Sequence, residues 1–497
     1  MVDYKQLVEA QHEFVKTNQP ANLQYRREQL LKLKKLISEN AERLTEAVYK
    51  DLRREQRTTH CLEIGPSLTE IDYCLQNLEE WAAPEYVEKT LVTLLDSPLI
   101  IREPLGVCLL IAPWNYPLLM VFLPLITMLS AGNTVLIKPS ELSPATSQLF
   151  EELFSAAFEK RYITVIQAGI EGTTELLRQK FDHILYTGNG TVGRIIMEAA
   201  AKHLSSTTLE LGGKCPAIVW SDADIEISAR RIVWGKFTNN GQTCLAPDYV
   251  ICASDVKEKL VKYFKQVLVE FYGSNCQESK DYSRIINERH FNRLQNLLKQ
   301  TNGRLLYKMD GELDQNDLFI PPHLFELDMN TSDALMDDEL FGPILPIFEV
   351  DSFDDALEFV NKRDKPLAIY IFTRTEALVN DFLSRTRSGA VTVNDVVLHI
   401  TVDTLPFGGV GGSGYGAYHG KFGFEQFSHK RAVLKRGFFG ESLASARYAP
   451  MTENKFKQLS SLSKRRSLWK PVQKLANDWQ GALFIFAIGL LIGLFLK

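Results

Sequence analysis

Residues 183–193 read HILYTGNGTVG, and this stretch decides the fold. A short apolar run that can form a buried strand leads directly into the glycine spacing GxGxxG, and residues 194–202 follow with a helical pattern. A strand, a glycine-rich turn and a helix in this order favour a dinucleotide site, because backbone N–H groups at the start of the helix can face a pyrophosphate. The candidate binding residues of the turn are Gly188, Asn189, Gly190, Thr191, Val192 and Gly193.

Short apolar runs separated by helical stretches continue on both sides of this motif. The predicted strands cover residues 107–111, 134–137, 163–166, 217–220, 249–252, 369–372 and 390–393. Strand–helix alternation of this length implies a doubly wound parallel sheet. We therefore expect an α/β fold, with a Rossmann-like dinucleotide-binding domain and a second α/β domain that begins after Lys214.

Three further segments depart from this alternation. Residues 21–83 place apolar side chains at helical spacing, so they are predicted to be helical up to Pro84. Residues 90–101 are rich in leucine and β-branched residues, and Pro98 predicts an edge or protruding strand rather than a central one. Residues 310–330 are polar and are predicted to be irregular.

These patterns divide the chain into five parts. We expect the dinucleotide-binding domain at 1–83 and 105–214, the catalytic domain at 215–400, oligomerisation segments at 84–104 and 401–440, a linker at 441–478 and a membrane anchor at 479–497. Within the oligomerisation segments, residues 85–104 and 430–440 would form a small β arm that adds strands across a dimer.

The anchor is predicted from residues 481–496, which are uncharged and almost wholly apolar. As a helix they would span ~24 Å, somewhat short of a hydrocarbon core of ~30 Å. Basic residues precede the run, as on the cytosolic flank of an anchor, although a buried terminal helix or a plain polar linker would also fit. We expect a transmembrane helix that places the protein on the cytosolic face of the endoplasmic reticulum, with peroxisomal and outer mitochondrial membranes as alternatives.

Bulk composition excludes several classes of partner. The net charge of −5 provides no global positive field, so no nucleic acid is expected. Seven cysteines without CxxC spacing predict neither a disulfide framework nor a zinc site, and no metal is expected.

The candidate chemistry rests on a thiol and a carboxylate. Cys244 lies in GQTC at 241–244, and Glu210 lies 34 positions earlier in LELGGK at 209–214. A thiol nucleophile and a base that activates water are two groups needed to oxidise an aldehyde through a thioester, and the dinucleotide site supplies the hydride acceptor. Asn115, in PWNYP at 113–117, could donate to the oxyanion. Glu210 also lies 22 positions after Gly188, near the place where a dinucleotide fold uses an acidic residue on the ribose, so two roles compete for it.

Six motifs occur in an order that resembles the aldehyde dehydrogenase superfamily over about residues 5–435, particularly its class 3, fatty aldehyde dehydrogenase branch. They are PWNYP at 113–117, KPSE at 138–141, YTG at 186–188, LELGGK at 209–214, GQTC at 241–244 and ELFGP at 339–343. The resemblance implies that Cys244 is the nucleophile, that Asn115 and the Cys244 backbone N–H bind the oxyanion, and that Glu210 is the general base. The thiolate must be favoured, so a polar or positive environment is expected around Cys244.

The resemblance also implies a cofactor site. Lys138 and Glu339 would bind ribose hydroxyls, and Phe341 would lie near the nicotinamide. Glu141 disfavours a 2′-phosphate, which favours NAD over NADP. Asn189 and Gly190 replace a small hydroxyl residue and a threonine that are commoner in the wider family, so a looser turn is expected there.

Together these features predict an NAD-dependent, membrane-bound homodimer that oxidises medium- to long-chain aliphatic aldehydes to carboxylic acids. The apolar run at 118–123 would line a substrate tunnel or simply pack against the sheet. A dehydrogenase that transfers the acyl group to coenzyme A and an inactive, membrane-tethered structural protein are the alternatives. Glu210 argues against the first, because that reaction needs no water-activating base. The joint presence of Cys244, Glu210, Asn115 and Lys138 argues against the second.

Overall fold

The computed structural model describes residues 3–439 and 441–463, and it divides the chain into two units. The larger unit contains residues 1–78 and 104–427, and the smaller contains residues 79–103 and the chain from 428 onward. Within the described residues, no helix has the length and apolar character needed to cross a bilayer. The predicted anchor at 479–497 lies outside the described residues.

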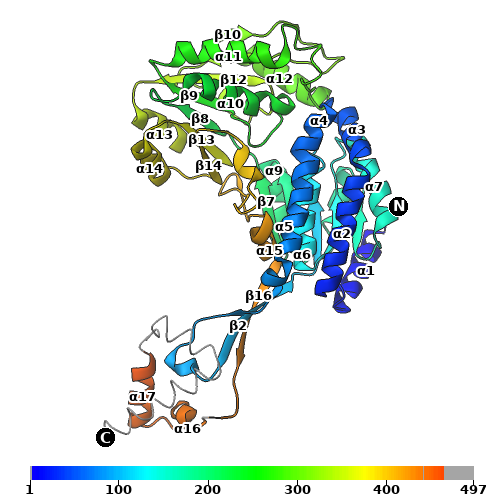
Figure 1. The fold of residues 1–497 in the computed structure, drawn as a ribbon, viewed down its shortest axis with the longest axis vertical. Helices are drawn as coiled ribbons and strands as arrows, with labels where there is room; N and C mark the ends of the chain where they lie inside the picture. The colour runs from blue at the N-terminus through cyan, green and yellow to red at the C-terminus, as the bar shows by residue number, and fades with distance from the viewer. Residues whose placement is uncertain (1–2, 440, 464–497) are drawn as a thin grey trace. The chain divides into compact units, whose positions relative to one another are not determined.

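A six-stranded sheet forms the first half of the larger unit, in the order β15-β7-β6-β3-β4-β5 (Figure 1). All its strands are parallel except β15. The strands are β3 (Val107–Ile111), β4 (Thr134–Lys138), β5 (Ile163–Val165), β6 (His183–Gly188), β7 (Ser206–Leu211) and β15 (Gly414–Tyr415). The strands expected around residues 107, 134, 163 and 183 are therefore confirmed, since apolar runs that are buried on both faces identify parallel strands well.

Helices cover both faces of this sheet. The N-terminal helices are α1 (Tyr4–Lys16), α2 (Leu23–Glu39), α3 (Ala41–Leu52), α4 (Gln56–Thr59) and α5 (Gly65–Ala82). The connecting helices are α6 (Leu119–Ala131), α7 (Pro144–Ala157), α8 (Ile170–Leu176) and α9 (Gly190–Ala201). Val8 of α1 and Ile196 of α9 pack on one face. On the other face α6 and α7 connect parallel strands and are backed by α2 and α3.

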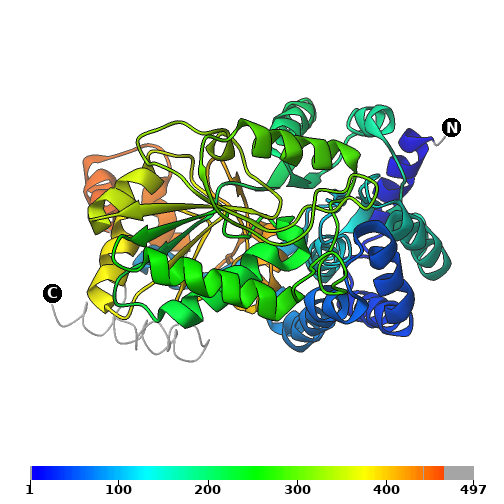
Figure 2. The same ribbon diagram turned by 90° about the horizontal axis from the view of Figure 1, so that it is seen from above.

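A seven-stranded sheet forms the second half of the larger unit, in the order β10-β11-β12-β9-β8-β13-β14 (Figure 2). Only β10 is antiparallel to its neighbour. The strands are β8 (Pro216–Val219), β9 (Tyr249–Ala253), β10 (Arg304–Lys308), β11 (His323–Glu326), β12 (Ile344–Val350), β13 (Ala368–Phe372) and β14 (Ala390–Val393). The helices are α10 (Ile225–Phe237), α11 (Lys257–Tyr272), α12 (Glu288–Gln300), α13 (Phe353–Asn361) and α14 (Glu376–Arg385). Helix α15 (Gly420–Gln426) packs instead against α6 of the first half.

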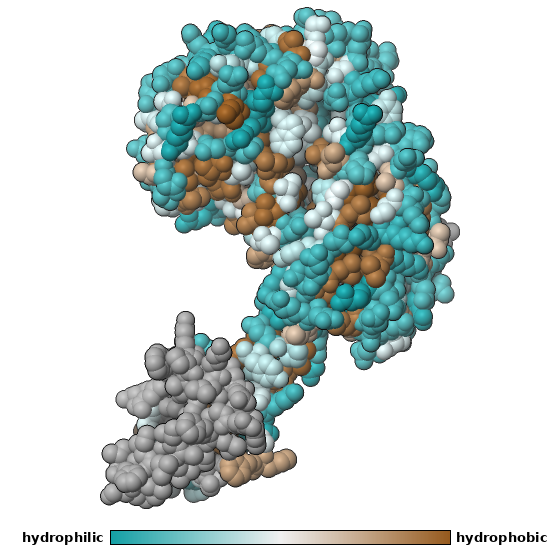
Figure 3. All heavy atoms as spheres, viewed as in Figure 1, coloured by the Kyte–Doolittle hydropathy of each residue, from teal (hydrophilic) through white to brown (hydrophobic). Residues whose placement is uncertain are grey.

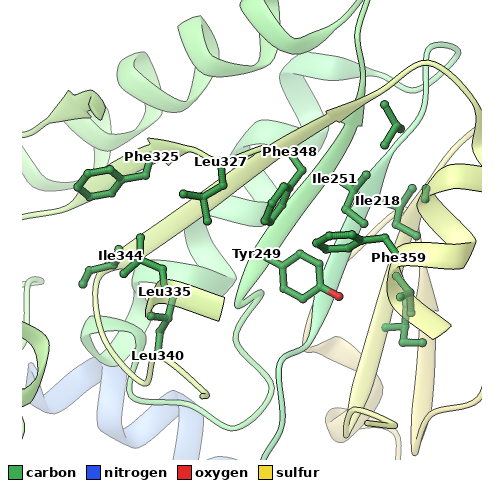
Figure 4. Close-up of a cluster of buried hydrophobic side chains, with 14 of the residues drawn as sticks. Ile218, Tyr249, Ile251, Phe325, Leu327, Leu335, Leu340, Ile344, Phe348 and Phe359 are labelled. Atoms are coloured by element: carbon green, nitrogen blue, oxygen red, sulfur yellow. The ribbon is translucent and has the colours of Figure 1, made fainter. Parts of the chain in front are cut away.

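The core of the second half joins strand residues to helix residues (Figure 4). Tyr249 and Phe348 project from β9 and β12 and meet Phe359 of α13, with ring centroids 4.8–6.0 Å apart. Edge-to-face and tilted aromatic pairs of this kind add stability beyond the area that they bury. The surface of the described residues is largely hydrophilic on the face shown in Figure 3, where hydrophobic residues gather in separate patches.

Two strands of the seven-stranded sheet depart from the sequence patterns. The stretch at 310–330 was expected to be irregular, but it contains β11, so that prediction is wrong. The strand HLFE is only four residues long and has no β-branched residue, which leaves little signal for a strand. Strand β12 carries Pro346 between two neighbouring strands, a position that proline usually avoids because it cannot donate to the ladder.

The smaller unit contains a three-stranded sheet in the order β1-β2-β16. Its strands are β1 (Glu85–Tyr86), β2 (Ser97–Pro104) and β16 (Ser428–Lys435), and short helices follow at α16 (Glu441–Ala444) and α17 (Glu453–Ser463). The strand expected over 90–101 is shifted, because residues Leu91–Thr93 form a 3₁₀ turn. The prediction of an edge strand is wrong, since β2 is the middle strand and tolerates Pro98 as its second residue.

Candidate active site

The predicted site residues of the six-stranded sheet lie at one edge of it. Parallel strands align their carboxyl ends, and the register pairs Ile111 with Lys138 and Tyr186, and Thr187 with Glu210. The strand order reverses between β3 and β6, and open α/β sheets bind ligands at such a switch point. Asn115 follows β3 by four residues and therefore belongs to the same edge.

Cys244 lies in a loop that an unusual turn presents to this edge. Helix α10 ends at Phe237, and Asn239, Asn240 and Gly241 then adopt left-handed backbone conformations. Gly241 is required, because a Cβ there would lie 2.3 Å from the carbonyl oxygen of Gly342. The buried Gln242 side chain ties the loop down, donating to the carbonyl of Arg284 and accepting from the N–H of Ile286.

The electrostatic environment of Cys244 differs from the one expected. Burial raises the pKa of the Cys244 thiol well above its usual value, and the carboxyl groups of Glu339 and Glu210 raise it further. A polar or positive environment is expected from the sequence, but no positive side chain of the described residues is among the groups that shift this pKa, and burial and negative charge favour the neutral thiol. These two effects also place both carboxyl groups within electrostatic range of Cys244.

Glu210 is a buried carboxyl group with little to stabilise its charge. The residue is 2% exposed, its Oε1 atom has no hydrogen-bond partner, and the backbone N–H of Gly409 is its stabilising donor. Burial raises the pKa of Glu210 well above its usual value. A carboxylate with a raised pKa is a stronger base, so this environment suits proton abstraction from water.

Asn115 contacts the loop that carries Cys244. Its side-chain amide donates to the carbonyl of Gln242 at 3.1 Å, two residues before the thiol. Tyr116 makes a second link, since its hydroxyl lies 3.0 Å from the hydroxyl of Thr243. An amide nitrogen has two N–H groups, so one remains for an oxyanion.

A buried ion pair that sequence reasoning missed holds the backbone of Asn115. Arg54 is fully buried and donates to the Asn115 carbonyl at 3.1 Å and to the carboxylate of Glu63. Glu63 accepts in turn from the N–H groups of Leu118 and Leu119, each at 2.8 Å. One ion pair therefore fixes the whole turn from Asn115 to the start of α6.

No sequence signal distinguished this pair. Arg54 and Glu63 lie in a charged region with helical spacing, where such residues are usually solvated. The structure adds one local feature, because residues His60–Ile64 form a π-helical turn, and such turns are frequent at functional sites. The turn directs Glu63 into the interior, where it is completely buried.

Glu339 lies against the end of β7. A Cβ on Gly212 would lie 2.1 Å from its carboxylate oxygen, so a larger residue there would displace the Glu339 side chain, and the N–H of Gly213 donates to it. Burial raises the pKa of Glu339 to about 8, and the charge of Asp248 adds to the effect. The ammonium group of Lys214 donates to the carboxylate of Asp248 at 2.6 Å. This ion pair was not predicted from the sequence, and both of its charges act on the pKa of Glu339.

The predicted cofactor residues at this edge fit a dinucleotide. Lys138 is buried at the end of β4 and donates to Glu141. The hydroxyl of Thr187 is buried beside the glycine-rich turn and interacts with the side chain of Tyr418. Helix α9 begins at Gly190, four residues before the helix predicted over 194–202, and ends at Ala201.

The turn itself is more ordered than expected. The side chain of Asn189 caps α9 by accepting from the N–H of Val192 at 3.0 Å. This capping leaves the N–H groups of Gly190 and Thr191 at the helix start. The third glycine, Gly193, packs closely against β7, because a Cβ at this position would lie 3.1 Å from the side chain of Leu211.

Phe341 lies with other aromatic side chains near the loop of Asn115. Its ring meets Trp114 edge-on at 5.4 Å, and Trp114 lies 5.2 Å from His290. Phe341 also has a left-handed backbone, with φ of 48°, which is unusual for a bulky residue. A strained aromatic residue at this place is consistent with a ligand-contacting role.

Comparison with known proteins identifies the family. The family model "Aldehyde dehydrogenase family" matches residues 2–433. The chain belongs to the aldehyde dehydrogenase family. It is 45% identical to mouse "Aldehyde dehydrogenase family 3 member A2" over 433 residues, which are 87% of this chain and 88% of the relative.

Two more comparisons agree with this membership. Mouse "Aldehyde dehydrogenase, dimeric NADP-preferring" is 45% identical over 86% of this chain and 93% of its own length. The solved structure of Staphylococcus aureus AldH in a substrate-bound state is 38% identical, with a TM-score of 0.89, and covers 93% of this chain and 100% of that one. This aldehyde dehydrogenase is thus an enzyme of a family that uses a nicotinamide cofactor.

Proposed function

We propose that this enzyme oxidises medium- to long-chain aliphatic aldehydes to carboxylic acids with NAD, through a thioester on Cys244 that Glu210-activated water hydrolyses. The observation that carries the proposal is that Cys244 and Glu210 are both buried and close enough for the Glu210 carboxyl group to raise the pKa of the Cys244 thiol. Family membership supports aldehyde oxidation independently.

In the first half-reaction the Cys244 thiolate adds to the aldehyde carbon. The side-chain N–H of Asn115 and the backbone N–H of Cys244 then donate to the oxygen that becomes negative. Arg54 and Glu63 keep the Asn115 backbone in place while this charge develops. A nicotinamide cofactor, when bound, would accept the hydride from the same carbon, and its positive charge would favour the thiolate form of Cys244.

In the second half-reaction water attacks the thioester carbonyl. Glu210 takes a proton from this water, and the Cys244 sulfur departs as the carboxylic acid forms. The unpaired Oε1 of Glu210 offers an acceptor that no protein group occupies. Because the Glu210 carboxyl is near enough to raise the pKa of the Cys244 thiol, the water-activating role is favoured over ribose binding.

For the cofactor we propose that Lys138 and Glu339 bind ribose hydroxyls and that the carboxylate of Glu141 disfavours a 2′-phosphate. The contact between Lys138 and Glu141 supports this, since it places a negative charge beside the candidate ribose-binding cation. A mouse relative is named NADP-preferring, so the choice is testable by comparing kcat/KM for NAD and NADP. Glu141→Ala should reduce the ratio of kcat/KM for NAD to kcat/KM for NADP.

The substrate class is proposed from the groups around the acyl position. Tyr418 is fully buried within electrostatic range of Cys244, its hydroxyl lies 3.8 Å from the Met120 sulfur, and Phe407 packs edge-on against its ring. Such apolar neighbours suit an aliphatic chain. Residues 118–123 are all buried, which packing against the sheet explains by itself.

We also propose the organisation that these roles require. The six-stranded half would bind the cofactor, and the seven-stranded half would supply the thiol. The three-stranded sheet leaves β16 as an edge strand within the described residues, and one mouse relative is named dimeric, so a homodimer that extends this sheet is proposed. Residues 481–496 would anchor the enzyme in a membrane, where long aldehydes partition.

The direct test is aldehyde-dependent NADH production across a series of saturated aldehydes of increasing chain length. The proposal expects kcat/KM to rise from short to long chains and the product to be the free acid without coenzyme A. A preference for small hydrophilic aldehydes would contradict the substrate class, and a strict requirement for coenzyme A would favour acyl transfer instead. Sedimentation in detergent should give a dimer, and a monomer would contradict the proposed arm.

A further inference from the structure

Three side chains that are distant in sequence, and that the proposed reaction does not use, converge at one place. Glu70 lies on α5, Asp403 follows the 3₁₀ turn Leu398–Thr401, and His419 immediately precedes α15. One ligand atom from each, two carboxylate oxygens and an imidazole nitrogen, lie within 4.8 Å of one another. No sequence motif identifies this group, because its members are spread over 350 positions of the chain.

Two members of the group are buried without the partners that they need. Glu70 is 0% and His419 is 2% exposed. Oε1 of Glu70 accepts from the N–H of Gly420 at 2.7 Å, but Oε2 of Glu70 and both ring nitrogens of His419 have no hydrogen-bond partner. Leaving a buried polar atom unpaired costs roughly 1–3 kcal/mol, so three such atoms together call for a ligand.

The distance between the two buried groups suits a shared cation better than a hydrogen bond. Nδ1 of His419 lies 3.5 Å from Oε2 of Glu70, which is long for a charge-assisted hydrogen bond at roughly 2.8 Å. Two ligands that each lie about 2.1 Å from a tetrahedral Zn²⁺ would be separated by roughly 3.4 Å. The observed separation is therefore close to that of two atoms bound to one metal ion.

The donor chemistry of the group points the same way. One imidazole nitrogen and two carboxyl groups are donors that divalent first-row cations bind, and two ionised carboxylates supply the negative charge that such a cation balances. Asp403 is also half-buried, so an ion can enter from its side.

Backbone conformation at His419 adds an independent observation. His419 has φ of 102°, a region that a residue with a side chain seldom occupies. Strained residues of this kind persist where the surrounding structure demands a particular side-chain position, and they cluster at ligand sites. The strain directs the His419 ring toward Glu70 while it stacks on Tyr418 at 6.1 Å.

We propose that Glu70, Asp403 and His419 form a structural binding site for a divalent first-row cation, with Zn²⁺ as the best fit to one imidazole and two carboxylates. A water molecule would complete four-coordination. The cation joins α5 to the segment 403–420, whose Gly409 donates to Glu210. It thus braces the loop over the general base without taking part in the reaction, and the site does not depend on the function proposed above.

The test measures metal binding by the full-length protein in detergent, with Cys244→Ser as the background so that the reactive thiol does not compete for Zn²⁺. After dialysis against buffered Zn²⁺, mass spectrometry of the metal content should give one equivalent per chain. Asp403→Asn and His419→Asn should each weaken binding at least about tenfold, since even the loss of an outer partner costs a metal site that much. Co²⁺ should give a visible spectrum of nitrogen and oxygen coordination that His419→Asn abolishes.

A matched control comes from a second histidine–carboxylate pair. Nδ1 of His12 lies 3.8 Å from Asp182 in the described structure, and no third ligand is grouped with them there. His12→Asn should leave the stoichiometry and affinity unchanged. The proposal is overturned if the parent protein binds less than stoichiometric Zn²⁺, or if Asp403→Asn and His12→Asn behave alike. Mn²⁺, which favours carboxylates over thiolates, must also raise the melting temperature of the parent protein but not that of Asp403→Asn.

Discussion

Glu63 and Glu210 are both buried carboxyl groups of the larger unit, but their surroundings are opposite. Glu63 is neutralised by Arg54 and accepts two backbone N–H groups, whereas Glu210 has one backbone donor and an oxygen with no partner. A carboxylate with all its partners is a fixed structural point, because removing any partner is costly. A carboxyl group without them keeps a raised pKa and remains available as a base. The comparison separates residues that hold the site from residues that react in it.

The largest effect should come from the reacting side of this comparison. Cys244→Ser should lower kcat by at least roughly 10⁴-fold, because the serine hydroxyl is a far weaker nucleophile than the thiol. Catalytic residues also act together, so the loss of the nucleophile removes most of the rate enhancement. NADH formation with a long-chain aldehyde measures it. Cys61→Ser, at an exposed thiol, should retain activity within a few-fold. Equal losses in the two variants would refute the assignment of the nucleophile.

Arg54→Met tests the structural role of the ion pair between Arg54 and Glu63. Removing one partner of a buried ion pair should lower the free energy of unfolding by about 3–5 kcal/mol, because Glu63 is left buried and uncompensated. Loss of the contact with the Asn115 carbonyl should also lower kcat by roughly tenfold to a hundredfold. Denaturant unfolding and kinetics on the same preparation measure both effects.

Arg54→Lys distinguishes positioning from simple stability. Lysine restores the charge but not the fork that reaches both Glu63 and Asn115. Stability should recover more than kcat does, while KM for the aldehyde stays near that of the parent enzyme. Full recovery of kcat would contradict a positioning role for Arg54.

Glu339 is a third buried carboxyl group, and its raised pKa predicts how the free energy of unfolding depends on pH. Its folded-state pKa of about 8 exceeds that of an unfolded carboxyl group, so the folded state holds a proton that the unfolded state has lost over the intervening range. Its contribution to stability is fully present below about pH 4 and is lost as the pH rises toward about 8, by at most about 1.4 kcal/mol per pH unit. Relative to Glu339→Gln, the parent protein should therefore lose stability between pH 5 and 8. Parallel stability–pH curves for the two proteins would contradict the raised pKa.

The smallest effect should come from an exposed ion pair. Arg230 and Glu270 form a two-pronged contact on the surface, at 2.6 and 2.8 Å, but water solvates both groups. Arg230→Ala should change the unfolding midpoint by only a small fraction of the Arg54→Met effect and leave kcat unaltered. A comparable loss would show that burial is not what separates the two arginines.

Much of the fold could be predicted from apolar periodicity. Strands such as Val107–Ile111 and Ala368–Phe372 are uninterrupted apolar runs, and the structure places them in the two parallel sheets. His323–Glu326 and Pro346 of β12 escaped prediction because tertiary pairing overrides weak or unfavourable local propensity there. Pairing with strands that are distant in sequence determines these strand positions, which four residues of local sequence do not.

The candidate site could be predicted only in part. Motifs identified Cys244, Glu210 and Asn115, but their mutual geometry depends on the turn at Asn239 and on the alignment of strand ends. Arg54 and Glu63 could not be found, because a buried ion pair and a solvated one have the same residue types. The raised pKa of Cys244 was also unexpected, since it follows from burial and from two carboxyl groups that are distant in sequence.

The central claim is that Glu210 activates the water that hydrolyses a Cys244 thioester, and Glu210→Gln tests it most directly. The enzyme is mixed with NAD and a long-chain aldehyde, NADH is followed from the first turnover, and intact mass is then measured. We predict a burst of about one NADH per active site, an acyl adduct on Cys244, and a steady-state rate roughly 10²- to 10⁴-fold lower than that of the parent enzyme. Steady turnover at the parent rate, or slow turnover with neither a burst nor an adduct, would contradict the account.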